Sequence, residues 1–404
     1  MRFLFVNQTF YPDVASSGQH LADLCSAMAA RGHEVTVVAG QRAYDDPETL
    51  FPPSGTWQDV KIRRVPSLGL GKSIKWKRVV DGLSFSMLCG ARLPWFERQD
   101  VVVSLTSPPL ISVVGLVAAR LHKCRFVHWT MDLNPDEAVA AGWLAKGSFS
   151  ERLLEQLSRI SLRGADRVIA LDEEMAALIR SKGVQPDKIS IVPPWSHTPD
   201  VRFDAEGRDR FRRQHGLERN FVVMYSGNHT PCHPLNTVIE AAHRLAPDPG
   251  ISFCFVGGGT EFRKLRASLR NGTRRQLPNV VCLPYQPRNE LSAVLSAADA
   301  HTVVMGNSMV GTVHPCKIYN LLHIGMPILY VGPRSSAAYR VVAGTPSGSR
   351  FAHGDADGLA ARILELRAAA GRSPRPVQFP SASRFSQETI LPRLIELLEL
   401  PSIV

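Results

Sequence analysis

Short apolar runs that alternate with helical stretches constrain the fold of this chain more than any other feature. The runs contain four to seven residues rich in Val, Ile and Phe, with little polar alternation. This pattern is typical of strands that are covered on both faces, as in a parallel sheet. We expect strands at residues 2–7, 34–39, 62–66, 101–105, 125–130, 167–170 and 189–192, and again at 221–225, 251–256, 280–283, 301–305 and 327–331.

The alternation stops once and then restarts. Residues 196–207 are polar and read as a linker, and a chain of 404 residues exceeds the usual size of a single core. The sequence therefore predicts an α/β fold with two doubly wound, Rossmann-like domains, residues 1–195 and 196–384. An amphipathic helix is expected in the remaining segment, 385–404.

Composition limits the classes of partner and compartment. The net charge of +11 suits an anionic small substrate, an anionic membrane surface or a nucleic acid, but no nucleic-acid recognition motif accompanies it. We therefore expect no nucleic acid. Seven cysteines, an odd number without metal-ligand spacing, indicate a reduced, cytoplasmic protein. No signal peptide precedes the first strand, and prolines interrupt the most apolar window, 101–121, so no spanning helix is expected.

Residues 312–330 form a loop, a helix and a strand with the chemistry of an anion site. The helix is expected to begin at Pro315 and to end at Gly325, which places Lys317 in its first turn. A helix N-terminus offers backbone N–H groups and a positive dipole to a phosphate. The alternative is a solvated surface lysine, although a cation in the first turn opposes the dipole. Further N–H donors are expected from the preceding loop, which contains Gly311 and Thr312.

Two glycine-containing loops follow strands of the second half. Gly227, Asn228 and His229 follow one strand, and the triplet 257–259 follows the next. Glycine lets a backbone approach a ligand closely, but the triplet lacks the full dinucleotide-binding spacing. The spacing from His229 to His233 does not set a helical ligand pair, so we expect no metal.

Two loops of the first half also follow strands. Residues 7–20 contain small residues before a helix, which suits either a ligand site or a plain strand-to-helix turn. The second loop, 128–137, carries Asp132, Asn134 and Asp136 out of an apolar strand. These carboxylates either face a ligand site or cap the helix that begins near Glu137.

Three motifs together resemble glycosyltransferase family 4, which has the GT-B fold. The first is the loop, helix and strand at residues 312–330, which contains Gly325-Met326-Pro327. The other two are the N-terminal motifs Phe10-Tyr11-Pro12-Asp13 and Ala30-Arg31-Gly32-His33-Glu34-Val35. The resemblance implies two domains that face each other across a cleft, the first for the acceptor and the second for the donor, with the last helix packing back on the first. It also implies a retaining, metal-independent transfer of a sugar from a nucleoside diphosphate to a glycan or polyprenyl-linked acceptor in surface polysaccharide synthesis.

The resemblance assigns roles to individual residues. Asp132 takes the acidic place at the reaction centre and Lys317 the place on the donor phosphates. The chain departs from the commonest pattern at two places where relatives carry glutamates, which here hold Thr312 and Asn320. The expected donor-binding residues are Gly227, Asn228, His229, Gly257, Gly259, Tyr285, Gln286, Gly311, Thr312, Lys317 and Asn320, and the expected acceptor-binding residues are Ser17, Gly18, His20 and Asn134.

A basic stretch with aromatic residues spans residues 61–78. It predicts peripheral contact with an anionic membrane, at the inner face of the plasma membrane, or with a lipid-diphosphate acceptor. The alternative is a solvated helix face. The charged and aromatic residues concerned are Lys61, Arg63, Arg64, Lys72, Lys75, Trp76, Lys77 and Arg78, with Trp95 and Phe96 nearby.

Two other functional classes fit a two-domain fold of this kind. A sugar-nucleotide 2-epimerase would need acidic residues in the cleft, and the second domain has few of them. A non-catalytic nucleotide-sugar-binding protein is suggested by the absence of the two glutamates.

Overall fold

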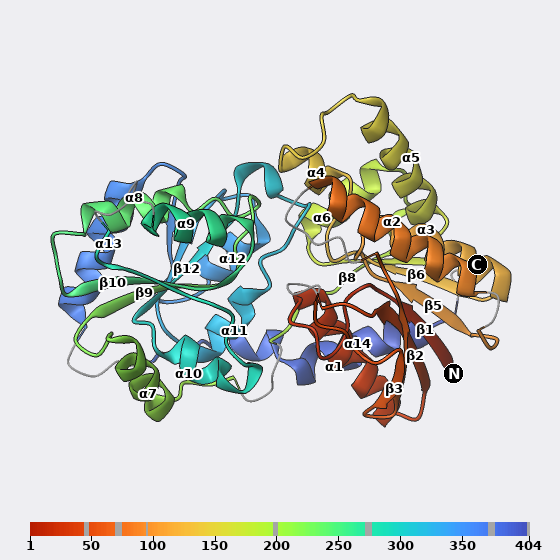
Figure 1. Ribbon diagram of the computed structural model, residues 1–404, viewed down its shortest axis with the longest axis horizontal. Coiled ribbons are helices and arrows are strands. Elements are labelled where there is room, and N and C mark those ends of the chain that lie inside the picture. Colours follow the sequence, from red (N-terminus) through yellow and green to blue (C-terminus); the bar gives the residue numbers. More distant parts are fainter. Residues whose placement is uncertain are drawn as a thin grey trace. The chain divides into compact units, whose positions relative to one another are not determined.

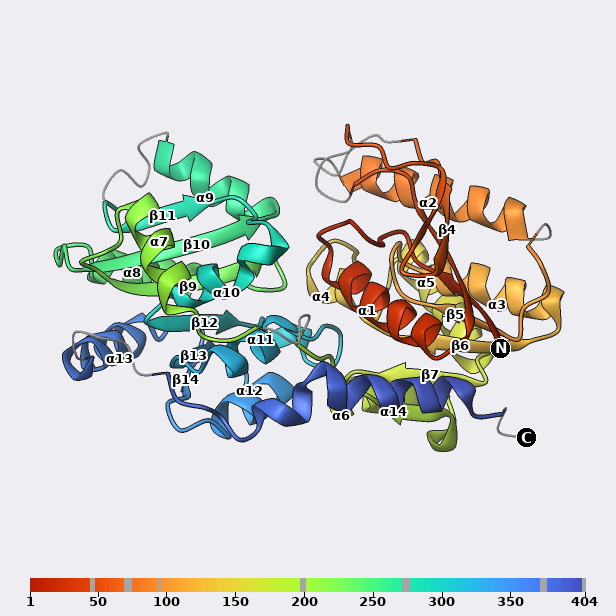
Figure 2. The same ribbon diagram turned by 90° about the horizontal axis from the view of Figure 1, so that it is seen from below.

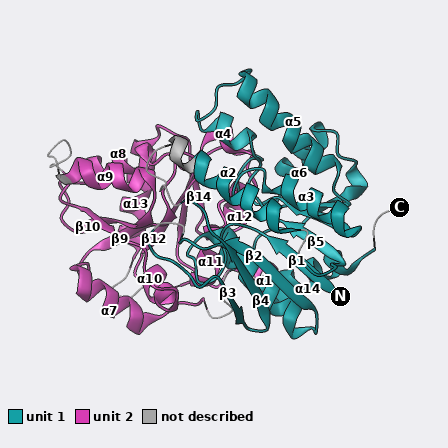
Figure 3. Cartoon of the chain, turned by 45° about the vertical axis from the view of Figure 1, so that its right-hand side comes forward, with its two compact units in different colours: residues 1–197, 311–314, 388–404 teal, residues 198–310, 315–387 magenta. Residues whose placement is uncertain are grey.

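The computed structural model describes residues 1–43, 48–68, 75–93, 96–196, 201–270, 277–370 and 376–401, without the side chains of 75–78 and 270. The chain forms two compact units (Figure 3). The first comprises residues 1–197, 311–314 and 388–404, and the second comprises 198–310 and 315–387. Each unit holds one mainly parallel sheet between layers of helices (Figure 1), so the prediction of two doubly wound α/β domains is confirmed.

The sheet of the first unit has eight strands in the order β3-β4-β2-β1-β5-β6-β7-β8. All neighbours are parallel except β3, which runs antiparallel to β4. The sequence did not predict β3, because it is a short edge strand with mostly exposed residues and no apolar run. The strands are β1 Arg2–Val6, β2 Glu34–Gly40, β3 Ser54–Trp57, β4 Val60–Val65, β5 Val101–Ser104, β6 Arg125–Trp129, β7 Arg167–Ala170 and β8 Ile189–Ile191.

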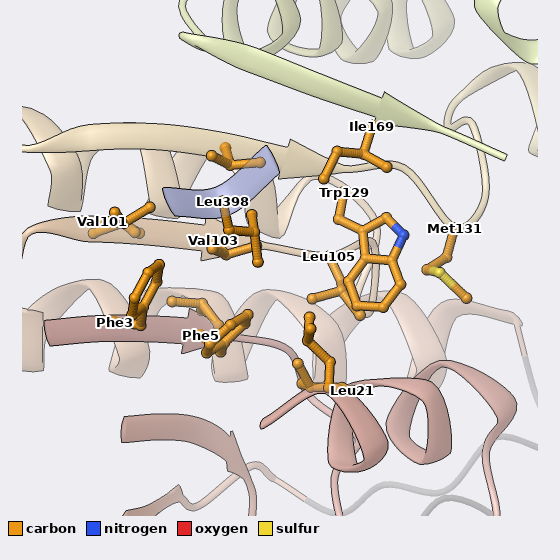
Figure 4. Close-up of a cluster of buried hydrophobic side chains, with 14 of the residues drawn as sticks. Phe3, Phe5, Leu21, Val101, Val103, Leu105, Trp129, Met131, Ile169 and Leu398 are labelled. Carbon is orange, nitrogen blue, oxygen red and sulfur yellow. The ribbon is translucent and has the colours of Figure 1, made fainter. Parts of the chain in front are cut away.

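One face of this sheet is covered by α1 (Ser16–Ala30) and by α14 (Gln387–Glu399). Figure 4 shows apolar side chains of the central strands, such as Phe5 and Val103, in one cluster with Leu21 of α1 and Leu398 of α14. The alternation of side chains along a strand places these residues on the same face. The C-terminal segment is thereby part of the first unit's core.

The other face carries α3 (Ile111–His122), flanked by α2 (Lys75–Arg92) and α5 (Phe149–Arg163) (Figures 1 and 2). Gly115 lets α3 lie close to the sheet, because a Cβ there would come within 2.8 Å of the Ser104 side chain and the Phe126 ring. Two more helices complete the unit, α4 Asp136–Ala140 and α6 Glu173–Ser181, with a 3-10 turn at Pro186–Lys188.

The sheet of the second unit has six parallel strands in the order β11-β10-β9-β12-β13-β14. β14 was not predicted, since only three residues pair there and Arg350 interrupts the apolar pattern. The strands are β9 Phe221–Asn228, β10 Ile251–Gly258, β11 Val280–Leu283, β12 Ala300–Val304, β13 Ile328–Val331 and β14 Ser349–Phe351.

Helices cover both faces of this second sheet. Along β9, Val223 and Tyr225 pack with the helices α8 and α13, whereas Val222 and Met224 pack with α7 and α10. This alternation explains why the strand reads as a continuous apolar run. The helices are α7 Ala205–His215, α8 Asn236–Arg244, α9 Thr260–Arg270, α10 Leu291–Ser296, α11 Lys317–Ile324, α12 Ala337–Ala343 and α13 Ala356–Ala369, with 3-10 turns at Arg288–Glu290, Asn307–Met309 and Ala382–Phe385.

One helix prediction needs correction. The helix expected from Pro315 begins at Lys317, with Cys316 as its N-cap. Residues 288–296 form a 3-10 turn followed by the short α10. Within the described ranges, no helix is both long and apolar enough to cross a membrane.

Candidate functional site

Lys317, the first residue of α11, is the most unusual side chain of the second unit. Its ammonium is buried and forms no hydrogen bond with any described residue. It lies 3.5 Å from the centre of the Tyr225 ring, a cation–π contact. Burial lowers the pKa of Lys317 to about 7. The structure therefore excludes the solvated-lysine interpretation, and an anion placed beside this group would stabilise its charged form.

Two glycine loops follow the adjacent strands β9 and β10, and Gly227 of the first lies next to the ammonium. Gly227 has a φ of 125°, and a Cβ there would come within 3.2 Å of Lys317 Nζ. Gly257, paired with Gly227 across β9 and β10, has a φ of 136°, and its Cβ would lie 2.1 Å from the Gly227 carbonyl oxygen. Gly259, with a φ of 107°, would place a Cβ 2.5 Å from Asn228 Oδ1. Only glycine fits at these positions, so the two loops stack directly on one another.

His229 supports the loops from inside. Its ring is fully buried, with centroids 4.6 Å from Tyr225 and 5.1 Å from Phe262. Its backbone N–H donates to Gly258, and its carbonyl accepts from the N–H of Glu261. Burial, and then the charge of Lys317, lower the pKa of His229 to about 3. The ring is therefore neutral, and it packs against the aromatic rings of Tyr225 and Phe262.

His233 resembles His229 in its charge state. Its Nδ1 lies 2.8 Å from the carbonyl oxygen of Val304, and burial followed by Lys317 lowers its pKa to about 3. In the part of the chain that the structure describes, no group of three or more His, Cys, Asp or Glu residues could hold a metal ion.

The remaining donor-side predictions lie near the same strand ends. Tyr285, which follows β11, is half-buried and close enough to Tyr225 to contribute to the raised pKa of that phenol, after burial itself. Gln286 Nε2 donates to the carbonyl of Pro284 at 2.9 Å. Asn320 is buried one turn after Lys317 on α11. Of the predicted donor residues, Gly227 thus lies next to Lys317, and Tyr285 lies close to Tyr225.

Gly311 and Thr312 belong to the first unit instead. A Cβ on Gly311, whose φ is 77°, would lie 2.8 Å from the Glu174 carbonyl oxygen. The carbonyl of Thr312 accepts from the N–H of Leu133 at 2.8 Å. The close contacts that the structure shows for this loop are thus with the first unit, and its role in donor binding stays a prediction.

Asp132 lies after the end of β6, where its backbone N–H donates to Thr106 Oγ1 at 3.3 Å. Asp132 lines a small cavity together with Ser112, His128 and Ser158. Burial, and then nearby Glu137, raise the pKa of Asp132 well above its usual range. This carboxyl is therefore suited to donate a hydrogen bond or a proton. Asn134, on the same loop, donates to Glu137 Oε2 at 3.1 Å.

The helix-cap interpretation of these carboxylates is wrong. The N-cap of α4 is Pro135, and no side chain caps that helix. Asp136 instead forms an ion pair with Lys182 at 2.8 Å, and the same ammonium is 2.5 Å from Glu155.

The predicted acceptor residues of α1 make contacts within the first unit. Ser17 Oγ lies 3.1 Å from Thr9 Oγ1, and a Cβ on Gly18 would come within 3.1 Å of the Phe10 nitrogen. The His20 ring is fully buried, with Nδ1 2.9 Å from the Ser16 carbonyl oxygen and Nε2 3.2 Å from that of Trp195. Gly18 thus allows close packing of α1, and His20 is engaged with the backbone.

The comparisons agree with this architecture. A model of the glycosyl transferase 4-like domain matches residues 17–195. The putative colanic acid biosynthesis glycosyl transferase WcaI of Escherichia coli K12 is 26% identical over 341 residues, which cover 80% of this chain and 82% of that protein. The probable glycosyltransferase WbjE of Pseudomonas aeruginosa is 25% identical over 271 residues, 67% of this chain and 66% of that protein. The chain is a glycosyltransferase whose residues 17–195 match a glycosyl transferase 4-like domain.

Solved structures extend the likeness of this glycosyltransferase to both units. Anabaena Alr3699/HepE, in complex with UDP and glucose, superposes with a TM-score of 0.73 at 16% identity, covering 98% of this chain and 99% of that one. WaaG, a glycosyltransferase involved in lipopolysaccharide biosynthesis, superposes with a TM-score of 0.72 at 17% identity, covering 99% of this chain and all of the other. At these identities the likeness establishes the GT-B fold. The epimerase and binding-protein alternatives are set aside, because the relatives are glycosyltransferases.

Sequence reasoning missed two parts of this glycosyltransferase site. Tyr225 was placed at the end of a strand, where a candidate loop begins, but without a role, although an aromatic residue two positions before Gly227 could have suggested contact with a ligand or a cation. The contact between Asp172 and His314 left no local signal, because the two residues are far apart in the chain.

Proposed function

We propose that this glycosyltransferase moves a sugar from a nucleoside diphosphate to a glycan or polyprenyl-linked acceptor in surface polysaccharide synthesis. The observation that carries the proposal is the buried ammonium of Lys317, which has no anionic partner among the described residues and lies beside two glycine loops. A diphosphate would supply the missing negative charge. WcaI, whose name refers to colanic acid biosynthesis, and the HepE complexes with UDP and with UDP-glucose support this class of donor and pathway.

The chemistry follows from where charge develops. In a retaining transfer, the bond between the anomeric carbon and the diphosphate oxygen breaks, and a bond to the acceptor oxygen forms with the same configuration. Negative charge grows on the leaving diphosphate, which can also take the proton of the acceptor hydroxyl. Lys317 would stabilise this charge, with help from backbone N–H groups of the loops at Gly227 and Gly257. In this proposal the reaction requires no metal ion, because the lysine supplies the positive charge.

Asp132 would act at the reaction centre as a neutral carboxyl. A group whose pKa is raised by burial can donate a hydrogen bond to a sugar or acceptor hydroxyl at neutral pH. Asn134 lies on the same loop and would contact the acceptor if its amide left Glu137. Asp132→Asn keeps a hydrogen-bond donor and should retain more turnover than Asp132→Ala, which keeps none.

Substitution of Lys317 tests the donor assignment. Lys317→Ala should abolish turnover and weaken nucleotide binding, measured by thermal shift and calorimetry with UDP, GDP, dTDP and their sugars. Lys264→Ala is a matched control, because that lysine is exposed and pairs only locally with Glu261 at 2.7 Å. Unchanged nucleotide affinity in the Lys317 variant would overturn the proposal.

Membrane contact of the first unit is a second part of the proposal, and the described residues shift its location. In the basic stretch, Lys61 is 3.8 Å from Glu34, and Arg64 is buried and donates to the carbonyls of Gly40 and Tyr11. The side chains of Lys72, Lys75, Trp76, Lys77, Arg78 and Trp95 lie outside the described residues.

Exposed apolar residues instead form stripes on adjacent helices. On α2, Val79, Leu83 and Met87 are spaced by four residues and are 60%, 57% and 74% exposed. Neighbouring α3 exposes Val117 and Leu121, and α5 exposes Phe149 and Leu153. Exposed basic residues near the ends of α2 and α3 add positive charge at Arg92, Arg98, Arg120 and Lys123. We propose that this face contacts an anionic membrane at the inner face of the plasma membrane.

Vesicle sedimentation tests this contact. Leu83→Ser combined with Met87→Ser should weaken binding to phosphatidylglycerol vesicles, whereas Val377→Ser, at an exposed apolar residue of the second unit, should not. Equal binding of all three proteins would contradict this part of the proposal.

A further inference from the structure

The four residues 311–314 belong to the first unit, although Lys317 belongs to the second. They lead into α11 and are held to the first unit at three points. Two of these points involve the backbone of Gly311 and Thr312, and the third is a side-chain pair, Asp172 and His314, that had no predicted role.

The first point is a buried pair between Asp172 and His314. Asp172 Oδ1 accepts from the N–H of Met175 at 2.8 Å and thereby caps α6. Its other oxygen, Oδ2, lies 2.8 Å from His314 Nδ1, and the side chains of Asp172 and His314 are only 7% and 2% exposed. A carboxylate can only accept, so Nδ1 carries the proton. Because the helix cap fixes the carboxylate, the carboxylate in turn fixes the ring.

The other two points are contacts of the backbone. Leu133, the residue after Asp132, donates its N–H to the Thr312 carbonyl at 2.8 Å. Gly311 lies so close to α6 that a Cβ would come within 2.8 Å of the Glu174 carbonyl oxygen. Positive φ and close approach both require glycine here.

The end of this segment is close in the chain to the donor lysine. Pro315 restricts His314 to extended conformations, and three residues span at most about 10 Å. The first backbone contacts of α11 follow at once, with Ile318 N–H donating to Pro315 and Tyr319 N–H to Cys316. Because the connection between His314 and Lys317 is short and its backbone is restricted, a displacement of His314 would also displace Lys317.

We propose that Asp172 and His314 are a positioning pair for the sugar transfer. They hold the segment that enters α11 and so set the place of Lys317, while the same segment supports the Asp132 loop through Leu133. The inference rests on the proposed function for the role of Lys317, but the positioning itself requires no ligand.

Hydrogen–deuterium exchange on the ligand-free protein is the deciding experiment. Asp172→Asn keeps an oxygen for the α6 cap but replaces the oxygen that faces His314 with an NH2 group. In this variant and in His314→Phe, amides at the start of α11 should exchange on the order of tenfold faster or more, since a tenfold change marks a measurable local opening. His314→Asn, which can place an N–H near the position of Nδ1, should restore slow exchange.

Asp355→Asn is the matched control. Asp355 caps α13 through Gly358 N–H at 3.0 Å in the same way, but the contacts found for it include no histidine. Unchanged exchange at 315–321 in both Asp172→Asn and His314→Phe would overturn the inference, as would an equal effect of Asp355→Asn.

Steady-state kinetics distinguishes a positioning role of the pair from a purely structural one. The donor is the sugar nucleotide that the thermal-shift and calorimetry measurements identify. Misplacement of Lys317 should lower kcat by on the order of 10- to 100-fold with a smaller change in the donor KM, and His314→Asn should recover part of the loss. A fall in folded protein with unchanged kcat per folded molecule would assign the pair a structural role only. Loss of nucleotide affinity in Lys317→Ala together with normal exchange and kcat in the Asp172 and His314 variants would refute this inference alone. Unchanged affinity in Lys317→Ala would refute the donor assignment, and the exchange measurement would still decide the positioning.

Discussion

Two lysines of this glycosyltransferase have buried ammonium groups in opposite environments. Lys182, in the first unit, is 3% exposed and pairs with both Asp136 and Glu155. Lys317, in the second, has its ammonium buried against the Tyr225 ring, without a hydrogen bond to the described residues. Burying an unpaired charge is unfavourable for the free protein, so it needs a compensating role. The first lysine is paired within the fold, whereas the proposed role of the second is to bind an anion.

The largest expected effect is the loss of stability on removing Lys182, the lysine that is paired with two carboxylates. Lys182→Met leaves two carboxylates near one another without their cation, which should lower the free energy of unfolding by about 3–5 kcal/mol. Urea unfolding monitored by tryptophan fluorescence measures it. Turnover per folded molecule should persist at low temperature, and a loss of turnover without a loss of stability would contradict the structural role.

The unpaired site should respond in the opposite way. Lys317→Met should reduce turnover by about 100- to 1,000-fold, the range for removing one group that stabilises transition-state charge. Its stability should be unchanged or higher, because no partner is left behind and a buried charge is removed. A destabilisation comparable to that of Lys182→Met would place Lys317 in the same structural class.

Titration sharpens the difference further. In the proposed role, the protonated form of Lys317 would bind a diphosphate, and burial lowers the pKa of Lys317 in the free protein to about 7. Nucleotide affinity should therefore be near its maximum below pH 7 and fall by up to about tenfold per pH unit above it. Stability of the free protein should rise between about pH 7 and the ordinary lysine pKa, because the unfolded state binds more protons there.

Calorimetry from pH 6 to 9 checks this dependence. Lys317→Arg is the control, since arginine keeps its charge throughout that range and should show a flat profile if it still binds. If the nucleotide affinity of the wild-type protein did not vary with pH, this would contradict binding of the nucleotide by Lys317.

The smallest effect belongs to a lysine at the surface. Lys264 is 72% exposed and pairs with Glu261 within one helix. Lys264→Ala should change the free energy of unfolding by less than about 1 kcal/mol and leave turnover intact. A larger change on either measure would mean that exposure alone does not distinguish the three lysines.

Most of the two sheets could be predicted from the sequence, because covered parallel strands leave continuous apolar runs. β7 and β11 have the predicted bounds, and most other predicted strands differ by only a few residues at their ends. β3 and β14 were missed, since short edge strands need only a neighbour to pair with. α13 was missed as well, although it contributes Leu359 and Ile363 to the core.

The site divides in the same way. Sequence by itself determined the two α/β domains, the glycines at 227, 257 and 259, and Lys317 at the start of a helix, because each leaves a local pattern. Only the tertiary structure decided that Lys317 pairs with no anionic group of the described residues, that His20 is engaged inside its unit, and that 311–314 belong with the first unit. Whether a charge or a ring nitrogen is paired depends on groups that are far away in the chain and that only folding brings close. A local sequence pattern therefore cannot predict it.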